Sequence, residues 1–279
     1  MQLKSFSKIN LKLKVNKKNK KNNLHDIQSY YCLIDLHDKI NVKVIRGRKD
    51  KIRFYGKFAK NISHSKNSVK DVLIGLRKRN LIFKHYSISI KKNIPVFGGL
   101  GGGSSNAAFL TKHFVEKKMK NSFLNGLSEK IGSDFKLFFC NQAFIKNLNE
   151  IVKFKKKHSL YFLLVYPNLR CSTKNIYSKI TKYSSKSILK FNKINTKNKF
   201  LKFLVKKDND LQNVVEKKYP KIKRLINEIG QFRGCYFSRL TGSGSVCYGV
   251  FKSRIAAKNA LSRVKLKYPK YWSSFAKTI

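Results

Sequence analysis

The amino-acid sequence predicts an α+β protein with two domains, and three observations lead to this prediction. Residues 8–15 alternate strictly between apolar and polar side chains, which is the period of a β-strand. A glycine-rich stretch at residues 95–105 joins a second strand pattern to a helix pattern. The chain then changes character near residues 145–158. We therefore expect one domain over residues 1–150 and another over residues 151–279.

The remaining elements follow from the spacing of apolar side chains. Residues 86–90 alternate as a strand does, and residues 107–118 carry apolar side chains at helical spacing. Residues 8–15 should form a half-buried strand with Lys8 and Asn10 on its polar face. Residues 160–165 are almost entirely apolar, as in a strand inside a sheet. Further strands are expected at residues 39–44, 52–55, 142–145 and 245–251, and further helices at residues 67–78, 211–229 (apart from Pro220) and 255–264.

Charge and composition limit the classes of protein. The formal net charge is +50, from 63 Lys and Arg against 13 Asp and Glu. A field of that size attracts nucleic acid, anionic membranes and anionic metabolites, although a lysine-biased composition explains it more simply. The chain has no apolar run near the ~18 residues of a membrane helix, and its first residues lack the apolar core of a signal peptide. Five scattered cysteines without a Cys-x-x-Cys pair favour reduced thiols in the cytoplasm and argue against a zinc site.

The glycine-rich stretch reads PVFGGLGGGSSNAA from Pro95 to Ala108. Glycines allow a tight turn and a close approach of the backbone to a ligand, and the helix that follows offers free N–H groups to an anion. Ser104 and Ser105 are expected at the helix cap, where their hydroxyls could also contact a phosphate or a metal. The stretch lacks the Lys of a Walker loop and the spacing of a dinucleotide fingerprint. A flexible linker is the alternative, but linkers rarely join a strand to a helix.

Asp134 is the strongest candidate for acid–base chemistry. It follows Gly132, where a helix pattern ends, and it precedes an apolar run that includes Phe135 and Phe138. Apolar neighbours partly remove the carboxylate from water, which suits a general base. The alternative is that Asp134 only caps the turn that follows.

The motif at residues 95–108 resembles the phosphate loop of the galactose, homoserine, mevalonate and phosphomevalonate kinase superfamily. Its triple glycine with Ser-Ser-Asn is most similar to the branch that phosphorylates a cytidylated methylerythritol. The resemblance implies an N-terminal domain like ribosomal protein S5 and a C-terminal ferredoxin-like domain, with the active site in the cleft between them. It also implies ATP as cofactor, with Mg²⁺ bridging the phosphates and no side chain assigned as a metal ligand. The ATP phosphates are assigned to Pro95, Val96, Phe97, Gly98, Gly99, Leu100, Gly101, Gly102, Gly103, Ser104 and Ser105.

Two shorter segments resemble the catalytic motifs of that superfamily. The Gly132–Asp134 segment is similar to the Gly-Ala-Asp-Val-Pro-Phe-Phe motif, whose Asp is the catalytic base, although Lys136 replaces the usual Pro. The sequence SKINL around Lys8 resembles Ala-Lys-Ile-Asn-Leu. The resemblance implies that Lys8 pairs with Asp134 and the transferred phosphate, and that Asn10 holds the substrate hydroxyl or a neighbouring oxygen.

Substrate-binding residues follow from weaker similarities. His25 resembles the His of a Gly-Tyr-His motif that recognises cytosine, although Leu24 replaces the Tyr, so one aromatic partner of the base is missing. Thr173 and Tyr177 lie in a segment similar to Ser-Thr-x-x-Ile-Tyr/Phe, whose aromatic residue would stack on a pyrimidine. Asn67 resembles an Asn near adenine. Residues 241–244, TGSG, resemble the third motif of the superfamily, a second glycine loop close to the first.

The most specific function consistent with these motifs is ATP-dependent phosphorylation of the 2-hydroxyl of the cytidylated methylerythritol, a step of the non-mevalonate isoprenoid pathway. The expected partners are therefore ATP and that substrate, with no specific nucleic acid and no membrane, and with a monomer or a homodimer as the assembly. A kinase of the mevalonate or homoserine type is one alternative, and a basic nucleic-acid-binding protein is another. The second alternative explains the charge but neither the glycine loop nor Asp134.

Overall fold

The computed structural model describes residues 1–18, 25–60, 62–63, 65–115, 121–148, 150–186 and 196–279. Packing divides the chain into two compact units. The first unit comprises residues 1–8, 36–96 and 101–140, and the second comprises residues 9–35, 97–100 and 141–279. The units interleave along the chain because two long strands, β1 (Gln2–Lys18) and β2 (His25–Ile45), contribute to both. A boundary at residues 150 and 151 stays a prediction.

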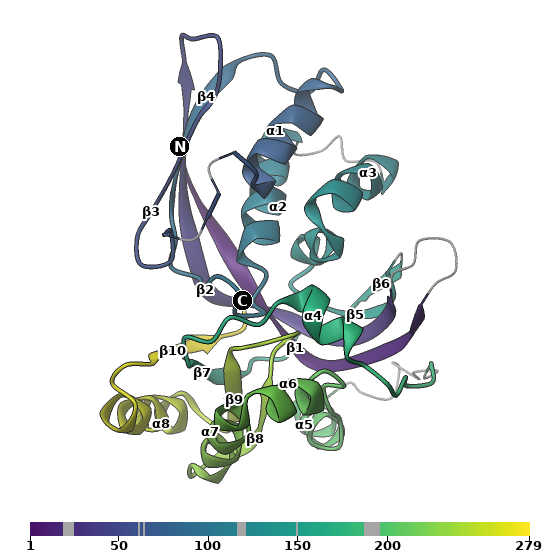
Figure 1. Ribbon diagram of the computed structural model, residues 1–279, viewed down its shortest axis with the longest axis vertical. Helices are drawn as coiled ribbons and strands as arrows, with labels where there is room; N and C mark the ends of the chain where they lie inside the picture. The colour runs from purple at the N-terminus through teal and green to yellow at the C-terminus, as the bar shows by residue number, and fades with distance from the viewer. Residues whose placement is uncertain (19–24, 61, 64, 116–120, 149, 187–195) are drawn as a thin grey trace. The chain divides into compact units, whose positions relative to one another are not determined.

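The first unit combines a sheet with a layer of helices (Figure 1). The second half of β2 pairs antiparallel with β4, and β4 pairs parallel with β3. Helix α1 packs against α2 and α3, and α2 also packs against the 3-10 helix η1. The bounds are β3 Lys51–Tyr55, β4 His85–Lys91, α1 Ser68–Arg77, α2 Gly102–Val115, α3 Asn121–Ile131 and η1 Ser133–Phe139.

Local signals explain why several of these elements form where the sequence predicts them. Asn67 caps α1 by accepting the backbone N–H of Lys70 at 3.0 Å, and the helix buries apolar side chains at helical spacing, including Val69, Val72 and Leu76. The predictions of a helix at residues 67–78, of a strand at 86–90 and of a helix end before Gly132 are confirmed. The helix predicted to continue to residue 118 is described only to Val115, because residues 116–118 lie outside the described part.

The second unit contains a four-stranded antiparallel sheet in the order β10-β7-β9-β8. Helix α7 packs against β8 and β9, and α8 packs against β7 and β10 (Figure 1). In the same unit the first half of β2 pairs with β5, and β5 pairs with β6. The strand bounds are β5 Gln142–Asn147, β6 Glu150–Lys153, β7 Tyr161–Tyr166, β8 Cys235–Leu240, β9 Cys247–Phe251 and β10 Trp272–Lys277; the helix bounds are α4 Thr173–Ser178, α5 Lys197–Val205, α6 Gln212–Lys218, α7 Pro220–Gln231 and α8 Arg254–Lys267.

The C-terminal part of the chain contains the predicted strand β7, the helix divided at Pro220, and one strand that was not predicted. The apolar strand β7 lies inside the sheet, and Pro220 divides the predicted helix into α6 and α7 by standing at the first position of α7. Strand β10 was not predicted from the sequence. Its residues do not alternate clearly, and it forms through pairing with β7 from Trp272 to Lys277.

Strand β1 corrects the prediction of a half-buried strand. Its polar face is also buried: Lys8 is 3% exposed, Asn10 is 4% exposed and Lys12 is 1% exposed. The alternation indicated one face in water, but each of these polar side chains meets groups from other segments. Lys12 lies 5.9 Å from the ring centre of Tyr30 and 6.0 Å from that of Phe203. Burial, together with the neighbouring charges of other lysines, lowers the pKa of Lys12 from 10.5 to about 8.

The lowered pKa of Lys12 predicts a pH dependence of stability. Between about pH 8 and 10.5 the unfolded chain keeps a proton on Lys12 that the folded chain has released. The contribution of Lys12 to stability therefore rises with pH in this window, by about 2–3 kcal/mol. Lys12→Met should be more stable than the wild type near pH 7, and this advantage should shrink toward pH 10 in denaturant titrations. Lys4→Met, at an exposed position of the same strand that does not act on the pKa of Lys12, should follow the wild-type profile; the same profile for Lys12→Met would contradict the assignment.

Two further findings concern the whole described chain. None of its helices is both long enough and apolar enough to cross a membrane, as judged over the described residues. All five cysteines are free thiols.

Candidate active site

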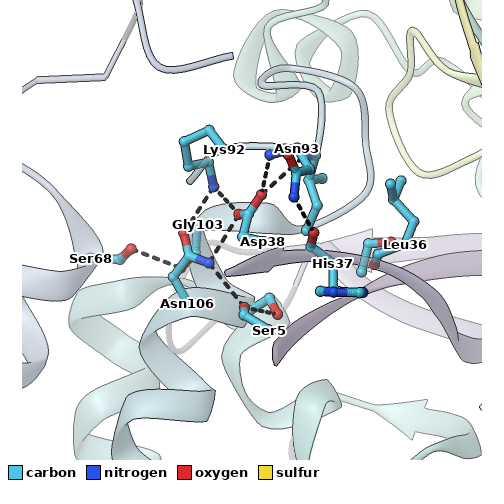
Figure 2. A network of polar contacts seen from close by, with 12 residues as sticks. Ser5, Leu36, His37, Asp38, Ser68, Lys92, Asn93, Gly103 and Asn106 are labelled. Atoms are coloured by element: carbon cyan, nitrogen blue, oxygen red, sulfur yellow. Dashed lines mark hydrogen bonds and ion pairs between the residues drawn. The ribbon is translucent and has the colours of Figure 1, made fainter. Parts of the chain in front are cut away.

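A buried polar network in the first unit lies next to the start of α2 (Figure 2). Asp38 of β2 is 0% exposed and forms an ion pair with Lys92, which is 2% exposed. Asn106 of α2 donates to Asp38 Oδ2 at 3.0 Å and to Ser5 Oγ at 2.9 Å, and its Oδ1 accepts from Lys92 Nζ at 2.8 Å. Asp38 Oδ1 accepts the backbone N–H groups of residues 93–94 at 2.8 and 2.9 Å. The network therefore fixes the segment that leads into the glycine loop against α2, β1 and β2.

The first unit also brings together the two residues predicted as catalytic. Lys8 Nζ of β1 lies 3.3 Å from Asp134 Oδ2 of η1. The ammonium group belongs to a side chain that is 3% exposed, whereas the Asp134 side chain is 35% exposed. Phe135 and Phe138 of η1 are both 0% exposed and anchor the short helix in the core. The arrangement leaves a partly accessible carboxylate beside a buried positive charge.

Lys112 of α2 holds η1 from its other end. Its Nζ donates to the backbone carbonyl of Phe138 at 2.6 Å and lies 4.6 Å from the ring centre of Phe109 and 5.3 Å from that of Phe139. Burial lowers the pKa of Lys112. A positive charge at the C-terminal end of a helix also interacts favourably with the exposed carbonyls there. Lys112 thereby helps to position the element that carries Asp134.

The start of α2 corrects the expected position of the two serines. The helix begins at Gly102, so Ser104 and Ser105 lie inside its first turns and not at the cap. The backbone N–H of Ser105 donates to the carbonyl of Gly101 at 2.8 Å, which is helical bonding. The Ser105 hydroxyl donates to the carbonyl of Phe6 at 2.5 Å and therefore anchors α2 to β1. The helix therefore starts before the two serines.

Gly101 lies against the side chains of Lys8 and Phe138. It adopts φ +71°, a conformation that favours glycine. A Cβ atom at this position would lie 3.3 Å from Lys8 Cε and 2.8 Å from Phe138 Cζ. The backbone at the N-terminus of α2 thus approaches Lys8 as closely as packing permits. Free N–H groups of that helix terminus and the Lys8 ammonium form one positively polarised region.

The middle of the glycine loop, residues 97–100, belongs to the second unit and packs on the second glycine loop. The backbone N–H of Val246 donates to the carbonyl of Gly98 at 3.2 Å. A Cβ atom at Gly99 would lie only 2.2 Å from the carbonyl oxygen of Thr241, so only glycine fits there. The prediction that the two glycine loops lie close together is confirmed for this part.

Residues predicted to bind the base also meet within the second unit. The ring centres of His25 and Tyr177 are 5.6 Å apart at an interplanar angle of 34°. A further ring, that of Tyr183, stacks on His25 at 5.4 Å and 29°. His25 Nδ1 lies 3.3 Å from the backbone oxygen of Asn16. Leu24 lies outside the described residues.

Thr173 and Asn10 both contact the second glycine loop. Thr173 Oγ1 lies 2.9 Å from Ser243 Oγ, and the backbone N–H of Asn10 donates to Thr241 Oγ1 at 3.1 Å. The side-chain amide of Asn10 donates to Ser29 Oγ at 2.9 Å. A role of Asn10 at the substrate hydroxyl stays a prediction.

Asn67 and Lys136 have local partners that explain their positions. Asn67 caps α1, and the next residue, Ser68, donates its hydroxyl to the carbonyl of Gly103 at 2.8 Å. The start of α1 therefore supports the start of α2, while a contact of Asn67 with adenine stays a prediction. Lys136 Nζ donates to Asn125 Oδ1 at 2.9 Å, so the substitution of the usual Pro links η1 to α3.

Sequence reasoning missed Asp38, Lys92, Lys112 and Tyr183. Asp38 and Lys92 are separated by 54 residues, and no periodicity distinguishes either from a surface residue. Lys112 sits on a helix whose lysines look solvated in the sequence. Tyr183 lies in a polar run rich in Lys and Ser, where its own aromatic ring was the only signal.

Comparison with known proteins gives the class. The family described as "GHMP kinases N terminal domain" matches residues 67–130, and "GHMP kinases C terminal" matches residues 188–270. A solved 4-(cytidine 5′-diphospho)-2C-methyl-D-erythritol kinase has a TM-score of 0.76 over 100% of both chains at 19% identity. A homoserine kinase from Cytophaga hutchinsonii has a TM-score of 0.68 over 100% of this chain and 94% of that chain at 13% identity. Fold and glycine loop together define the class of the GHMP small-molecule kinases.

Curated relatives identify the family within this class of kinases. The 4-diphosphocytidyl-2-C-methyl-D-erythritol kinase of Pelagibacter ubique is 39% identical over 100% of this chain and 99% of its own length. An enzyme of the same name from Ureaplasma parvum is 31% identical over 88% of this chain and 93% of its own length. The chain therefore belongs to the 4-diphosphocytidyl-2-C-methyl-D-erythritol kinase family. The superfamily and the two-domain α+β fold predicted from the motifs are confirmed.

Proposed function

We propose that the chain transfers the γ-phosphoryl group of ATP to the 2-hydroxyl of 4-diphosphocytidyl-2-C-methyl-D-erythritol, a step of the non-mevalonate isoprenoid pathway. One structural observation supports the proposal independently of family membership. In the first unit, Lys8, Asp134 and the backbone of Gly101 converge, with Lys8 Nζ 3.3 Å from Asp134 Oδ2. This set contains a base, a positive charge and the start of a helix, which are the groups that transfer of a phosphoryl group to an alcohol requires.

The mechanism assigns one task to each of these groups. Asp134 accepts the proton of the substrate 2-hydroxyl, the hydroxyl oxygen forms a bond to the γ-phosphorus, and ADP leaves with the electrons of the broken P–O bond. Lys8 stabilises charge on the phosphoryl oxygens. The N–H groups at the start of α2 bind phosphate oxygens. Residues 95–105 are thus the proposed phosphate cradle.

We propose that Mg²⁺ binds together with ATP. Mg²⁺ prefers oxygen ligands and keeps several waters, so phosphate oxygens suit it, and when bound it neutralises charge on the β- and γ-phosphates. The partly exposed Asp134 carboxylate is an oxygen donor on this chain that fits such an ion. Within the described residues, no three His, Cys, Asp or Glu side chains cluster as a metal site. We propose a cytoplasmic enzyme, monomeric or homodimeric, without a specific nucleic-acid partner.

Coupled measurement of ADP release tests the function directly. ATP turnover should depend on the cytidylated methylerythritol, and it should be near background with homoserine or mevalonate. Turnover with either of those two alcohols, but not with the cytidylated one, would replace the substrate assignment by a sister activity. No turnover with any of the three, together with sequence-preferring RNA binding at about 200 mM salt, would favour a nucleic-acid-binding protein.

Gly103→Ala tests the phosphate cradle with little cost to the fold. A Cβ atom at Gly103 meets only Ser68 Oγ, at an ordinary 3.6 Å, and alanine favours a helix over glycine by about 1 kcal/mol. If phosphate oxygens lie against this turn, the methyl group should raise the KM for ATP about 10-fold with an unchanged or higher Tm. Gly47→Ala, in an open loop where the nearest side chain is 3.9 Å away, is the matched control and should change neither value. A folded Gly103→Ala enzyme with the wild-type KM for ATP would remove Gly103 from the cradle.

A further inference from the structure

Three aromatic side chains of the second unit form a cluster that we call the ring cluster: His25, Tyr177 and Tyr183. The imidazole contacts both tyrosine rings, at 5.6 Å from Tyr177 and 5.4 Å from Tyr183. The stacking angle with Tyr183 is 29°, close to parallel. Tyr183 nevertheless keeps 41% of its side chain exposed. A large aromatic side chain that is held by stacking and still faces solvent offers a ring surface to a ligand.

Hydrogen bonds fix the segment that carries Tyr183. The backbone N–H of Ser184 donates to the carbonyl of Val15 at 2.9 Å, and Asn16 Nδ2 donates to the carbonyl of Ser184 at 2.6 Å. The Ser184 hydroxyl donates to Asp210 Oδ2 at 2.8 Å. Three bonds at one residue tie the segment to the end of β1 and to the start of the α6 region. The neighbouring Tyr183 ring is therefore presented from a fixed backbone.

An ion pair two residues beyond Ser184 also fixes the segment that carries Tyr183. Lys186 Nζ pairs with Asp26 Oδ2 at 2.8 Å, and Asp26 directly follows His25 on β2. The segments that carry Tyr183 and His25 are thus joined by an ion pair as well as by their rings. Because a ligand that stacks on a ring loses less entropy when the ring is already held, this construction suits recognition of a flat group.

We propose that Tyr183 is a substrate-binding residue whose ring stacks on the pyrimidine of the cytidylated substrate, as a third member of the site with His25 and Tyr177. The inference rests on the proposed function, because it needs a substrate with a base. Aromatic rings stack on every base, so Tyr183 contributes affinity, while hydrogen-bonding groups such as His25 distinguish one base from another. Tyr183 lies outside the sequence motifs that resemble the superfamily.

The test compares Tyr183→Ala and Tyr183→Phe with Tyr236→Ala. Tyr236 is a matched control because it belongs to the same unit and is 42% exposed, against 41% for Tyr183. Tyr183→Ala should raise the KM for the cytidylated substrate about 10-fold, with kcat and the KM for ATP within about twofold of the wild type. Tyr183→Phe keeps the ring and should restore the KM. Tyr236→Ala should leave all three values and the Tm unchanged.

A binding measurement separates recognition of the base from catalysis. Cytidine 5′-diphosphate, titrated by calorimetry into the full chain saturated with a non-hydrolysable ATP analogue, should bind Tyr183→Ala about 10-fold more weakly than the wild type. Equal affinity of the two proteins, or an unchanged KM in Tyr183→Ala, would overturn the role of Tyr183 while the enzyme stays active. A wild-type chain without substrate-dependent turnover would instead overturn the proposed function. If that chain still lost cytidine 5′-diphosphate affinity in Tyr183→Ala, the ring cluster would stand as a pyrimidine site.

Discussion

Asp134→Asn should lower kcat at least 100-fold while the KM for ATP stays within about twofold of the wild type. Asparagine has the shape of aspartate but cannot accept the proton of the substrate hydroxyl. Lys8 stays 3% exposed and loses the charge that faces it at 3.3 Å, so the substitution also disturbs the stabilisation of the phosphoryl oxygens. Because the glycine loop is the proposed phosphate cradle, ATP binding should persist. Steady-state kinetics and nucleotide titration of the folded variant measure the two effects separately.

Asp71→Asn is the matched control for this charge change. Asp71 lies in the first turn of α1, in the same unit as Asp134, and is partly exposed. Its substitution should change kcat less than twofold and stability by about 0.5 kcal/mol. An Asp134→Asn enzyme that retains more than about a tenth of the wild-type kcat would remove Asp134 from the proton transfer.

Lys8 and Asp134, the two residues predicted as catalytic, show which part of the candidate site the sequence could predict. Gly132 and the apolar residues after Asp134 are local signals, and they correctly placed the carboxylate just after the end of a helix and before a buried apolar run. Lys8 has no such signal, because its strand alternates like a half-exposed one, and only similarity to a known motif assigned it a role. Lys8 is buried because Asp134 of η1 and Gly101 of the glycine loop, which come from distant parts of the sequence, lie against it.

The elements of the fold also differ in whether local sequence signals or distant contacts determine them. Helix α1 and strand β4 form where the spacing of apolar residues predicts them, because that signal acts within a few residues. Strand β10 depends instead on a pairing partner, β7, more than a hundred residues earlier, and its own residues WSSFAK carry no clear period. The stacking of Tyr183 on His25 is likewise a tertiary contact between a polar run and a strand. Such contacts become visible only when the chain is folded.

Asp38→Ala should lower the free energy of unfolding by about 3–5 kcal/mol. The substitution strands the Lys92 ammonium, which is 2% exposed, and it removes the acceptor of the backbone N–H groups of residues 93–94. A buried charge without its partner costs much more than the pair contributes. Chemical denaturation near pH 7 measures the loss. Glu150→Ala is the control, because Glu150 belongs to an exposed pair with Lys146 and should cost less than about 0.5 kcal/mol.

A double-mutant cycle separates the stranded charge from the lost packing. Lys92→Met removes the ammonium, so the double variant Asp38→Ala with Lys92→Met should be less destabilised than the sum of the two single variants by at least about 1 kcal/mol. The folded Asp38→Ala variant should also bind ATP more weakly, because Asn106 and the segment before the glycine loop both lose their hydrogen bonds to Asp38. Two single effects that simply add, or a loss in Asp38→Ala no larger than in Glu150→Ala, would show that the ion pair does not fix the entry to the loop. A coupling energy of more than ~1 kcal/mol between Asp38 and Lys92, together with a raised KM for ATP in Asp38→Ala, would show that this buried network supports the proposed phosphate cradle.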